Sequence, residues 1–252
     1  MQDKKILALL GSSSRNAAIN TFFSNYVRGR NIDLTLITIQ EHGEDCNQSD
    51  ESDQHEELLD QLCTVCTERS IPLRITEMHS DAATAIHRRG AFVDLIIIEK
   101  DVLRKLALQD ELPEECSAII ALPDQFDGIR QVLLMYDGSH RASRAVKSFY
   151  QYFTPYARKL DATLLHIDKE ATTAPEDVDL LLVEYLRQFS ENIGILKVEK
   201  PINEKHLRAL PRAQPSLVVA NLDVLMALRG PDTTFKPFYD EQSILFIPAT
   251  YS

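Results

Sequence analysis

The sequence contains no tryptophan, only 8 glycines and no long uninterrupted hydrophobic run. Because a membrane-spanning helix needs roughly 18–20 consecutive apolar residues, we expect a chain that does not cross a bilayer. The first apolar run, Ile6–Leu10, is too short for the core of a secretion signal, and no cleavage pattern follows it. These absences predict a cytoplasmic protein whose 4 cysteines are kept reduced.

Positive charge is also scarce, since 27 Lys and Arg stand against 38 Asp and Glu, giving a formal net charge of −11. Binding to nucleic acid or to an anionic membrane surface needs clustered Lys and Arg, so we expect neither partner. Glu41–Asp60 contains no Lys or Arg at all. We expect its first part, to about Ser52, to be a mobile, solvated loop, with an acidic partner-binding tail as the alternative.

An internal repeat organises the 252 residues. Ile6–Ser12 aligns with Leu133–Ser139, with both glycines in register, and residues of the same kind follow in each copy. A chain of this length can hold one large domain or two of ordinary size, and the repeat favours two. We predict a first domain over residues 1–126 and a second over residues 127–252.

Each copy contains five apolar segments, most of them without polar alternation, as is typical of strands covered on both faces. In the first copy they are Ile6–Leu10, Leu34–Ile39, Pro72–Glu77, Asp94–Glu99 and Ala118–Leu122. In the second they are Leu133–Tyr136, Thr163–Ile167, Ile195–Glu199, Ser216–Asn221 and Ile244–Ile247. Helical spacing separates the first four strands of each copy, as in Glu56–Glu68, Asp81–Arg89, Pro175–Asn192 and Glu204–Leu210. The order β-α-β-α-β-α-β-β predicts an α/β fold with a doubly wound parallel sheet in each domain.

The turn after the first strand of each copy is the candidate ligand site. Doubly wound sheets bind ligands beyond the carboxyl ends of their strands, where the strand order reverses. The turn reads Asp137-Gly138-Ser139 in the second copy and Leu10-Gly11-Ser12 in the first. A glycine lets the backbone approach a ligand closely, and the following helix N-terminus favours anions. The alternative is a plain strand-to-helix turn with serine as the N-cap.

The second copy resembles the opening of a universal stress protein domain. The resemblance lies in its apolar strand, its Asp137-Gly138-Ser139 turn, and a small residue, Ala145, six positions after Ser139. Because the repeated order of strands and helices fits as well, the resemblance covers nearly the whole chain. It implies two tandem universal stress protein-like, adenine-nucleotide alpha-hydrolase-like domains. Their fifth strands would meet in an intramolecular pseudo-dimer, and a further homodimer is compatible with it.

The resemblance also implies where a small molecule would bind. Asp137, Gly138 and Ser139 would border the pocket, Ile167 at the end of the second strand would form another wall, and Val219 would form the floor.

Nucleotide-binding members of that family carry a second signature after the fourth strand, Gly-x-x-Gly, nine residues, then Gly-Ser or Gly-Thr. Residues 99–107 contain no glycine, and residues 221–230 contain only Gly230. We therefore expect no cofactor, with an adenine nucleotide as the alternative ligand. In the first domain Leu10 also replaces the aspartate, so that domain is expected to be degenerate.

Two other patterns have the residue types of chemical sites. Cys63 and Cys66 have redox or zinc spacing but lie inside a predicted helix, so we expect buried apolar side chains and no metal. Zinc would need further ligands from His42, Cys46 or His55. Asp137, Ser139 and His140 supply the residue types of a hydrolase triad, but neighbouring side chains on a turn diverge, so we expect no catalytic residue.

These observations predict a cytoplasmic universal stress protein-like protein that is not an enzyme. It would have a stress-response or regulatory role and bind a small molecule or a protein partner. One alternative is a nucleotide-binding switch or slow ATP hydrolase that uses the second-domain pocket, and the absent glycine loop argues against it. The other is a scaffold without a ligand, and the retained Asp137-Gly138-Ser139 turn argues against that.

Overall fold

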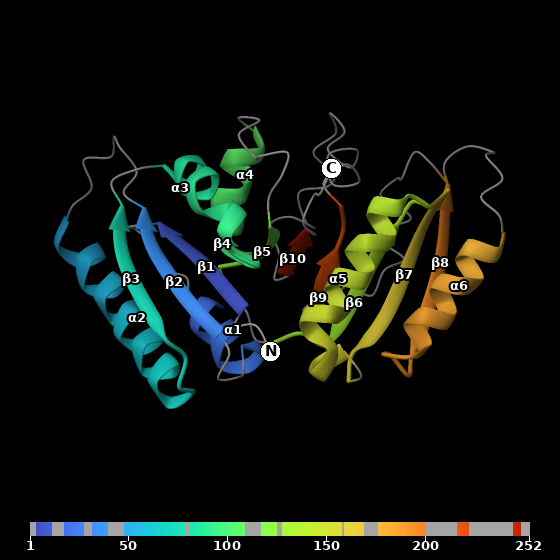
Figure 1. Ribbon diagram of the computed structural model, residues 1–252, viewed down its shortest axis with the longest axis horizontal. Coiled ribbons are helices and arrows are strands. Elements are labelled where there is room, and N and C mark those ends of the chain that lie inside the picture. The colour runs from blue at the N-terminus through green and yellow to red at the C-terminus, as the bar shows by residue number, and fades with distance from the viewer. Residues whose placement is uncertain are drawn as a thin grey trace. The chain divides into compact units, whose positions relative to one another are not determined.

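The computed structural model describes residues 4–11, 18–27, 32–39, 48–78, 81–108, 117–124, 128–157, 159–168, 176–199, 216–221 and 244–247. The chain divides into two compact units, one within Met1–Gly128 and one within Ile129–Pro248. Each unit contains a parallel sheet with helices packed on it (Figure 1). The predicted α/β fold class is therefore confirmed, while the expected pseudo-dimer stays a prediction.

The first unit contains a five-stranded parallel sheet in the order β3-β2-β1-β4-β5. Its strands are β1 (Lys4–Gly11), β2 (Ile32–Ile39), β3 (Leu73–Met78), β4 (Leu95–Glu99) and β5 (Ala118–Leu122). Its helices are α1 (Ala18–Tyr26), α2 (Gln48–Glu68), α3 (Ala82–Arg89), the short 3-10 helix η1 (Gly90–Phe92) and α4 (Lys100–Leu108). α1 packs against α2 and α3 against α4. Crossovers between parallel strands are almost always right-handed, and the strand order reverses after β3, so the two helix pairs belong to opposite faces of the sheet. Strands covered on both faces account for the continuous apolar runs.

Helix α2 is longer than the predicted Glu56–Glu68 and begins at Gln48. The expectation of a loop is therefore wrong for residues 48–52, while residues 41–47 lie outside the described residues. The acidic residues that suggested a loop also suit the first turns of a helix, because the helix dipole stabilises negative charge there.

Helix α4 is missing from the predicted order, in which β5 follows β4 directly. The two strands are parallel neighbours, and such strands need a crossover between them. Val102, Leu103 and Leu106 are buried at helical spacing and fix α4 against the sheet. The sequence signal for this helix was present, and the predicted order for the first unit was wrong at this point.

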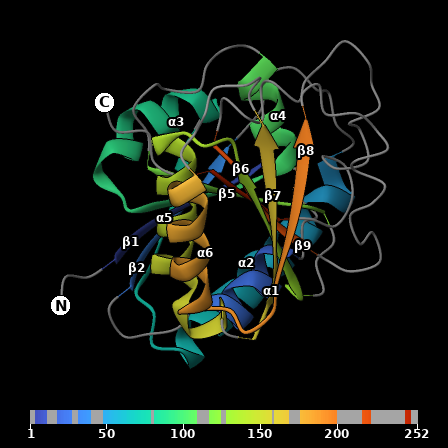
Figure 2. The same ribbon diagram turned by 90° about the vertical axis from the view of Figure 1, so that its right-hand side faces the viewer.

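The second unit contains a parallel sheet in the order β10-β9-β6-β7-β8. Its strands are β6 (Gln131–Tyr136), β7 (Asp161–Asp168), β8 (Ile193–Glu199), β9 (Ser216–Val219) and β10 (Ile244–Ile247), and its described helices are α5 (His140–Ala157) and α6 (Glu176–Arg187). The rings of Tyr150 on α5 and Tyr185 on α6 lie with their centroids 6.2 Å apart, so the two helices are neighbours; Figure 2 views both of them from the right-hand side of Figure 1. The predicted helix over Pro175–Asn192 ends earlier, and the predicted helix Glu204–Leu210 lies outside the described residues.

Aromatic side chains form much of the core beneath α5. Phe149 lies with its ring centroid 5.0 Å from that of Tyr150, 5.1 Å from that of Phe153 and 6.2 Å from that of Phe246 on β10. Tyr150 also stacks on Phe189 at 4.7 Å, and its hydroxyl shares a hydrogen bond with the Ser190 hydroxyl at 3.1 Å. Burial raises the pKa of Tyr150. The second unit therefore fills the space under α5 with rings.

Asp81 is the N-cap of α3, because its carboxylate accepts a hydrogen bond from the Thr84 backbone N–H at 2.7 Å. This bond lowers the pKa of Asp81 from its ordinary value of 3.8. We expect Asp81→Ala to lower the free energy of unfolding by about 1 kcal/mol, since helix caps of this kind contribute that much.

The same bond predicts a pH dependence. Because the folded-state pKa of Asp81 is depressed, its contribution is present above the unfolded pKa and is lost as the pH falls through the folded value. Asp81→Asn should retain most of the cap without titrating. Urea unfolding from neutral to acidic pH should therefore show a smaller loss of stability in Asp81→Asn than in the wild type. An equal loss in both proteins would contradict the assigned role.

Candidate functional site

The strand order of the second unit reverses between β6 and β9, which makes their carboxyl ends the switch point of the sheet. From β6 the chain proceeds outward through β7 to β8, whereas β9 and β10 lie on the other side. Asp137, Gly138 and Ser139 follow β6 directly, and Ala220 and Asn221 follow β9. The predicted turn therefore lies where sheets of this kind bind ligands.

The turn is held by its own polar side chains. Asp137 Oδ1 accepts a hydrogen bond from the Ser139 backbone N–H at 3.1 Å. The Ser139 hydroxyl oxygen accepts one from the Ala142 N–H at 3.1 Å, and the Ser139 carbonyl accepts one from the Ser143 N–H at 3.0 Å. Ser139 is thus the N-cap of α5, as the structural alternative predicted.

Gly138 gives the turn a feature that capping alone does not require. Its φ of +76° lies in the left-handed region, which side-chain-bearing residues rarely adopt. Gly138 is exposed, and no atom beyond its chain neighbours lies within 4 Å of the position that a Cβ would take. The backbone at this point is therefore open on the side where a Cβ would lie.

The other two predicted site residues belong to the core. Ile167 and Val219 are both buried, in β7 and β9, whereas Asp137, Gly138 and Ser139 retain solvent exposure. The pairing of Tyr136 with His166 brings the end of β7 alongside the end of β6. The structure thus gathers all the predicted residues on neighbouring strand ends or the turn, with only the turn exposed.

The first unit has a different switch point, between β1 and β4. Leu10, which takes the place of Asp137 in the repeat, is 0% exposed. Glu99, the last residue of β4, places its Oε2 atom 3.6 Å from the position of a Cβ on Gly11. A carboxylate therefore stands at this edge too, but on the neighbouring strand. Sequence reasoning missed Glu99 because its position beside Gly11 depends on the pairing of β1 with β4.

The two cysteines of α2 differ in their surroundings. Cys66 is buried, as predicted, and burial together with the nearby Cys63 raises its pKa to about 11. Cys63 is only half-buried, so the prediction is wrong for that thiol. Within the described ranges no group of three or more His, Cys, Asp or Glu could hold a metal ion, and His42 and Cys46 lie outside those ranges.

No protein family model matches the sequence, and no curated protein matches it. Solved structures do match. The universal stress protein from Archaeoglobus fulgidus DSM 4304 aligns over 100% of both chains, with a TM-score of 0.62 and 13% identity. A putative universal stress protein from Pseudomonas aeruginosa UCBPP-PA14 covers 98% of this chain and 93% of its own, with a TM-score of 0.53 and 14% identity. The chain has the universal stress protein fold.

The cytoplasmic domain of a prokaryotic cation chloride cotransporter is also similar. It covers 99% of this chain and 97% of its own length, with a TM-score of 0.56 and 13% identity. In the part of this chain that the structure describes, no helix is long and apolar enough to cross a membrane. The Asp137-Gly138-Ser139 turn thus belongs to a domain with the universal stress protein fold. A fold does not determine a function, which has to be argued from the site.

Proposed function

We propose that this chain is a cytoplasmic, non-catalytic binding protein with a stress-response or regulatory role, and that its second unit binds a small molecule at Asp137-Gly138-Ser139. The observation that carries the proposal is Gly138. It combines a left-handed backbone, exposure and open space with a location at the switch point of the sheet. These are the conditions under which a ligand can lie directly against the main chain.

The turn favours a ligand that donates hydrogen bonds. Asp137 supplies a half-buried carboxylate beside the open backbone, and a carboxylate accepts from a sugar hydroxyl or an amine. Within the turn, Asp137 is held by its bond to the Ser139 N–H. A side chain held in this way loses little conformational entropy when a ligand binds.

The contacts of Ser139 support a non-catalytic role. In a Ser-His-Asp triad the serine hydroxyl is hydrogen-bonded to the histidine, and the aspartate is bonded to the same imidazole. Here the Ser139 hydroxyl caps α5 through the Ala142 N–H, and Asp137 accepts from the Ser139 main chain. Both side chains have a structural role that organises the turn.

The absence of the glycine loop argues against the nucleotide-binding alternative. In that alternative, glycines after the fourth strand would supply backbone N–H groups to phosphate oxygens. Residues 99–107 have no glycine, and Gly230 is the only one in residues 221–230. Each lost hydrogen bond to a charged phosphate costs about 1.5–3 kcal/mol. Two or three such losses amount to roughly two to six decades of affinity.

Calorimetric titration with ATP and magnesium decides between this proposal and the nucleotide-binding alternative. We expect no binding at micromolar ATP. The matched variant is Asp137→Asn, whose amide oxygen can still accept from the Ser139 N–H but carries no charge. Micromolar binding in the wild type that is changed in Asp137→Asn would show that another phosphate cradle exists, and a nucleotide switch would then replace our proposal.

A further inference from the structure

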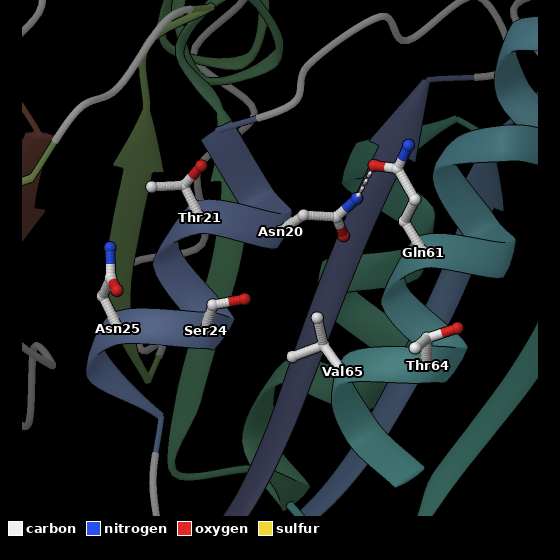
Figure 3. A pocket seen from close by; sticks show the side chains of 7 residues that line it. All are labelled: Asn20, Thr21, Ser24, Asn25, Gln61, Thr64 and Val65. Carbon is white, nitrogen blue, oxygen red and sulfur yellow. Dashed lines mark hydrogen bonds between the residues drawn. The ribbon is translucent and has the colours of Figure 1, made fainter. Parts of the chain in front are cut away.

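A polar cleft of about 530 Å³ lies between α1 and α2 of the first unit (Figure 3). It is lined by Asn20, Thr21, Ser24, Asn25, Gln61, Thr64 and Val65. All but Val65 have hydrogen-bonding side chains, and none is charged. The cleft is built on two helices that cover one face of the sheet, so it is separate from the turns at the strand ends.

Asn20 lines this cleft and has a buried side-chain amide. Its side chain is 8% exposed, and its Nδ2 atom donates to Gln61 Oε1 at 3.0 Å and to the Leu58 carbonyl at 3.4 Å. Because both partners accept hydrogen bonds, they fix which end of the amide is nitrogen. The buried Oδ1 atom has no hydrogen-bond partner. Figure 3 shows this oxygen on the side of the amide that faces away from Gln61.

A buried carbonyl oxygen without a donor is uncommon, because its lost hydration is normally replaced by a hydrogen bond. The second unit has no buried amide at the aligned position, because Lys147, the counterpart of Asn20 in α5, is exposed. The buried amide is therefore a feature of the first unit.

The second unit shows what closes the corresponding space. When the two copies are aligned, the buried pair Leu62 and Cys66 of α2 matches the buried pair Leu182 and Leu186 of α6. This alignment matches Val65 with Tyr185. The Tyr185 ring lies 6.2 Å from the Tyr150 ring and 5.0 Å from the Phe189 ring. A valine cannot fill the volume of a tyrosine, so the smaller residue leaves room beside α1.

We propose that this cleft binds a neutral polyhydroxylated small molecule, such as a sugar or sugar alcohol, through the hydroxyl and amide groups of its lining. A hydroxyl both donates and accepts, so it complements a lining of Ser, Thr, Asn and Gln side chains. A phosphate or an ammonium group would need an opposite charge in the lining, which is absent. The volume far exceeds the roughly 30 Å³ that one water molecule occupies.

Sorbitol and maltose are the probes, measured by saturation-transfer NMR and by calorimetric titration, with spermidine as a cationic comparison. We expect binding in the millimolar range or tighter by at least one of the two polyhydroxylated probes. Lys147→Ala, at an exposed residue outside both sites, should leave this binding unchanged. The Thr64 and Val65 variants described below change the cleft and leave the Asp137-Gly138-Ser139 turn intact, so they separate this proposal from the one for the second unit. Absence of binding by both probes, or stronger binding by spermidine, would overturn it.

Two threonines give a matched pair of variants. The Thr64 hydroxyl donates to the Asp60 carbonyl at 2.9 Å, and the Thr67 hydroxyl donates to the Cys63 carbonyl at 2.8 Å, but only Thr64 lines the cleft. Thr64→Ala should weaken probe binding about two- to tenfold, the range for one lost hydrogen bond, and Thr67→Ala should not. Equal effects of the two variants would contradict the location.

Val65→Tyr introduces a tyrosine into the cleft, the residue that stands at the aligned position 185 of the second unit. We expect it to abolish detectable probe binding while the circular dichroism spectrum remains that of the wild type. Unchanged binding in the folded variant would overturn the proposal. If Val65→Tyr does not fold, the comparison of Thr64→Ala with Thr67→Ala still decides the matter.

Discussion

Replacing Phe149 with alanine is expected to lower the free energy of unfolding by about 3–5 kcal/mol. Phe149 is 0% exposed, and its ring packs on those of Tyr150, Phe153 and Phe246. These neighbours come from both α5 and β10, and rings held by two elements cannot collapse fully into the space that the substitution leaves.

Urea unfolding measures this loss, and Lys147→Ala is the matched control because Lys147 is exposed on the same helix. The control should change the free energy of unfolding by no more than about 0.5 kcal/mol. A loss below about 1 kcal/mol in Phe149→Ala would contradict the packing of α5 on β10, since buried phenylalanines of this kind contribute several times more.

Restoring an aspartate in the first unit by Leu10→Asp is expected to unfold that unit and not to rebuild a site. Leu10 is 0% exposed at the carboxyl end of β1, between β2 and β4. The substitution removes a buried leucine, which costs about 2–5 kcal/mol. It also places a charge without a compensating partner in the core.

The pH dependence of the free energy of unfolding separates the cost of losing the buried leucine from the cost of burying a charge. Burial would raise the pKa of the new aspartate above its ordinary value of about 4, so the destabilisation should grow as the pH rises through and above that value. Leu10→Asn has nearly the same shape but no charge, so it is the matched control. The difference in the free energy of unfolding between the two variants should be large at neutral pH and shrink in acid. Equal stability of Leu10→Asp and the wild type would mean that position 10 is accessible to water.

The sequence predicts the strands well because their burial on both faces leaves long apolar runs. Ala118–Leu122 and Ile244–Ile247 are predicted with the bounds that the structure gives to β5 and β10. The predicted order omits helix α4, although Val102 and Leu106 are apolar at helical spacing and parallel strands require a crossover between them. The length of α2 was missed because an acidic run is compatible with both a loop and a helix start.

The candidate sites were predictable to different degrees. The Asp137-Gly138-Ser139 turn is local in the sequence, so its position and its serine cap follow from neighbouring residues. Glu99 and the Asn20 cleft depend on contacts between residues far apart in the chain. Asn20 stands among apolar residues such as Ile19 and Phe22, but only its contacts with α2 show a buried amide oxygen without a donor.

Mass spectrometry of the supernatant from denatured, purified protein tests the central claim most directly. If a small molecule binds at the turn of the second unit, the wild type should release an organic compound without a triphosphate, and Asp137→Asn should release less of it. Gly138→Val, which forces a branched side chain into a backbone with φ of +76°, should release none. Recovery of ATP or ADP, or of no compound that depends on these two residues, would contradict the claim.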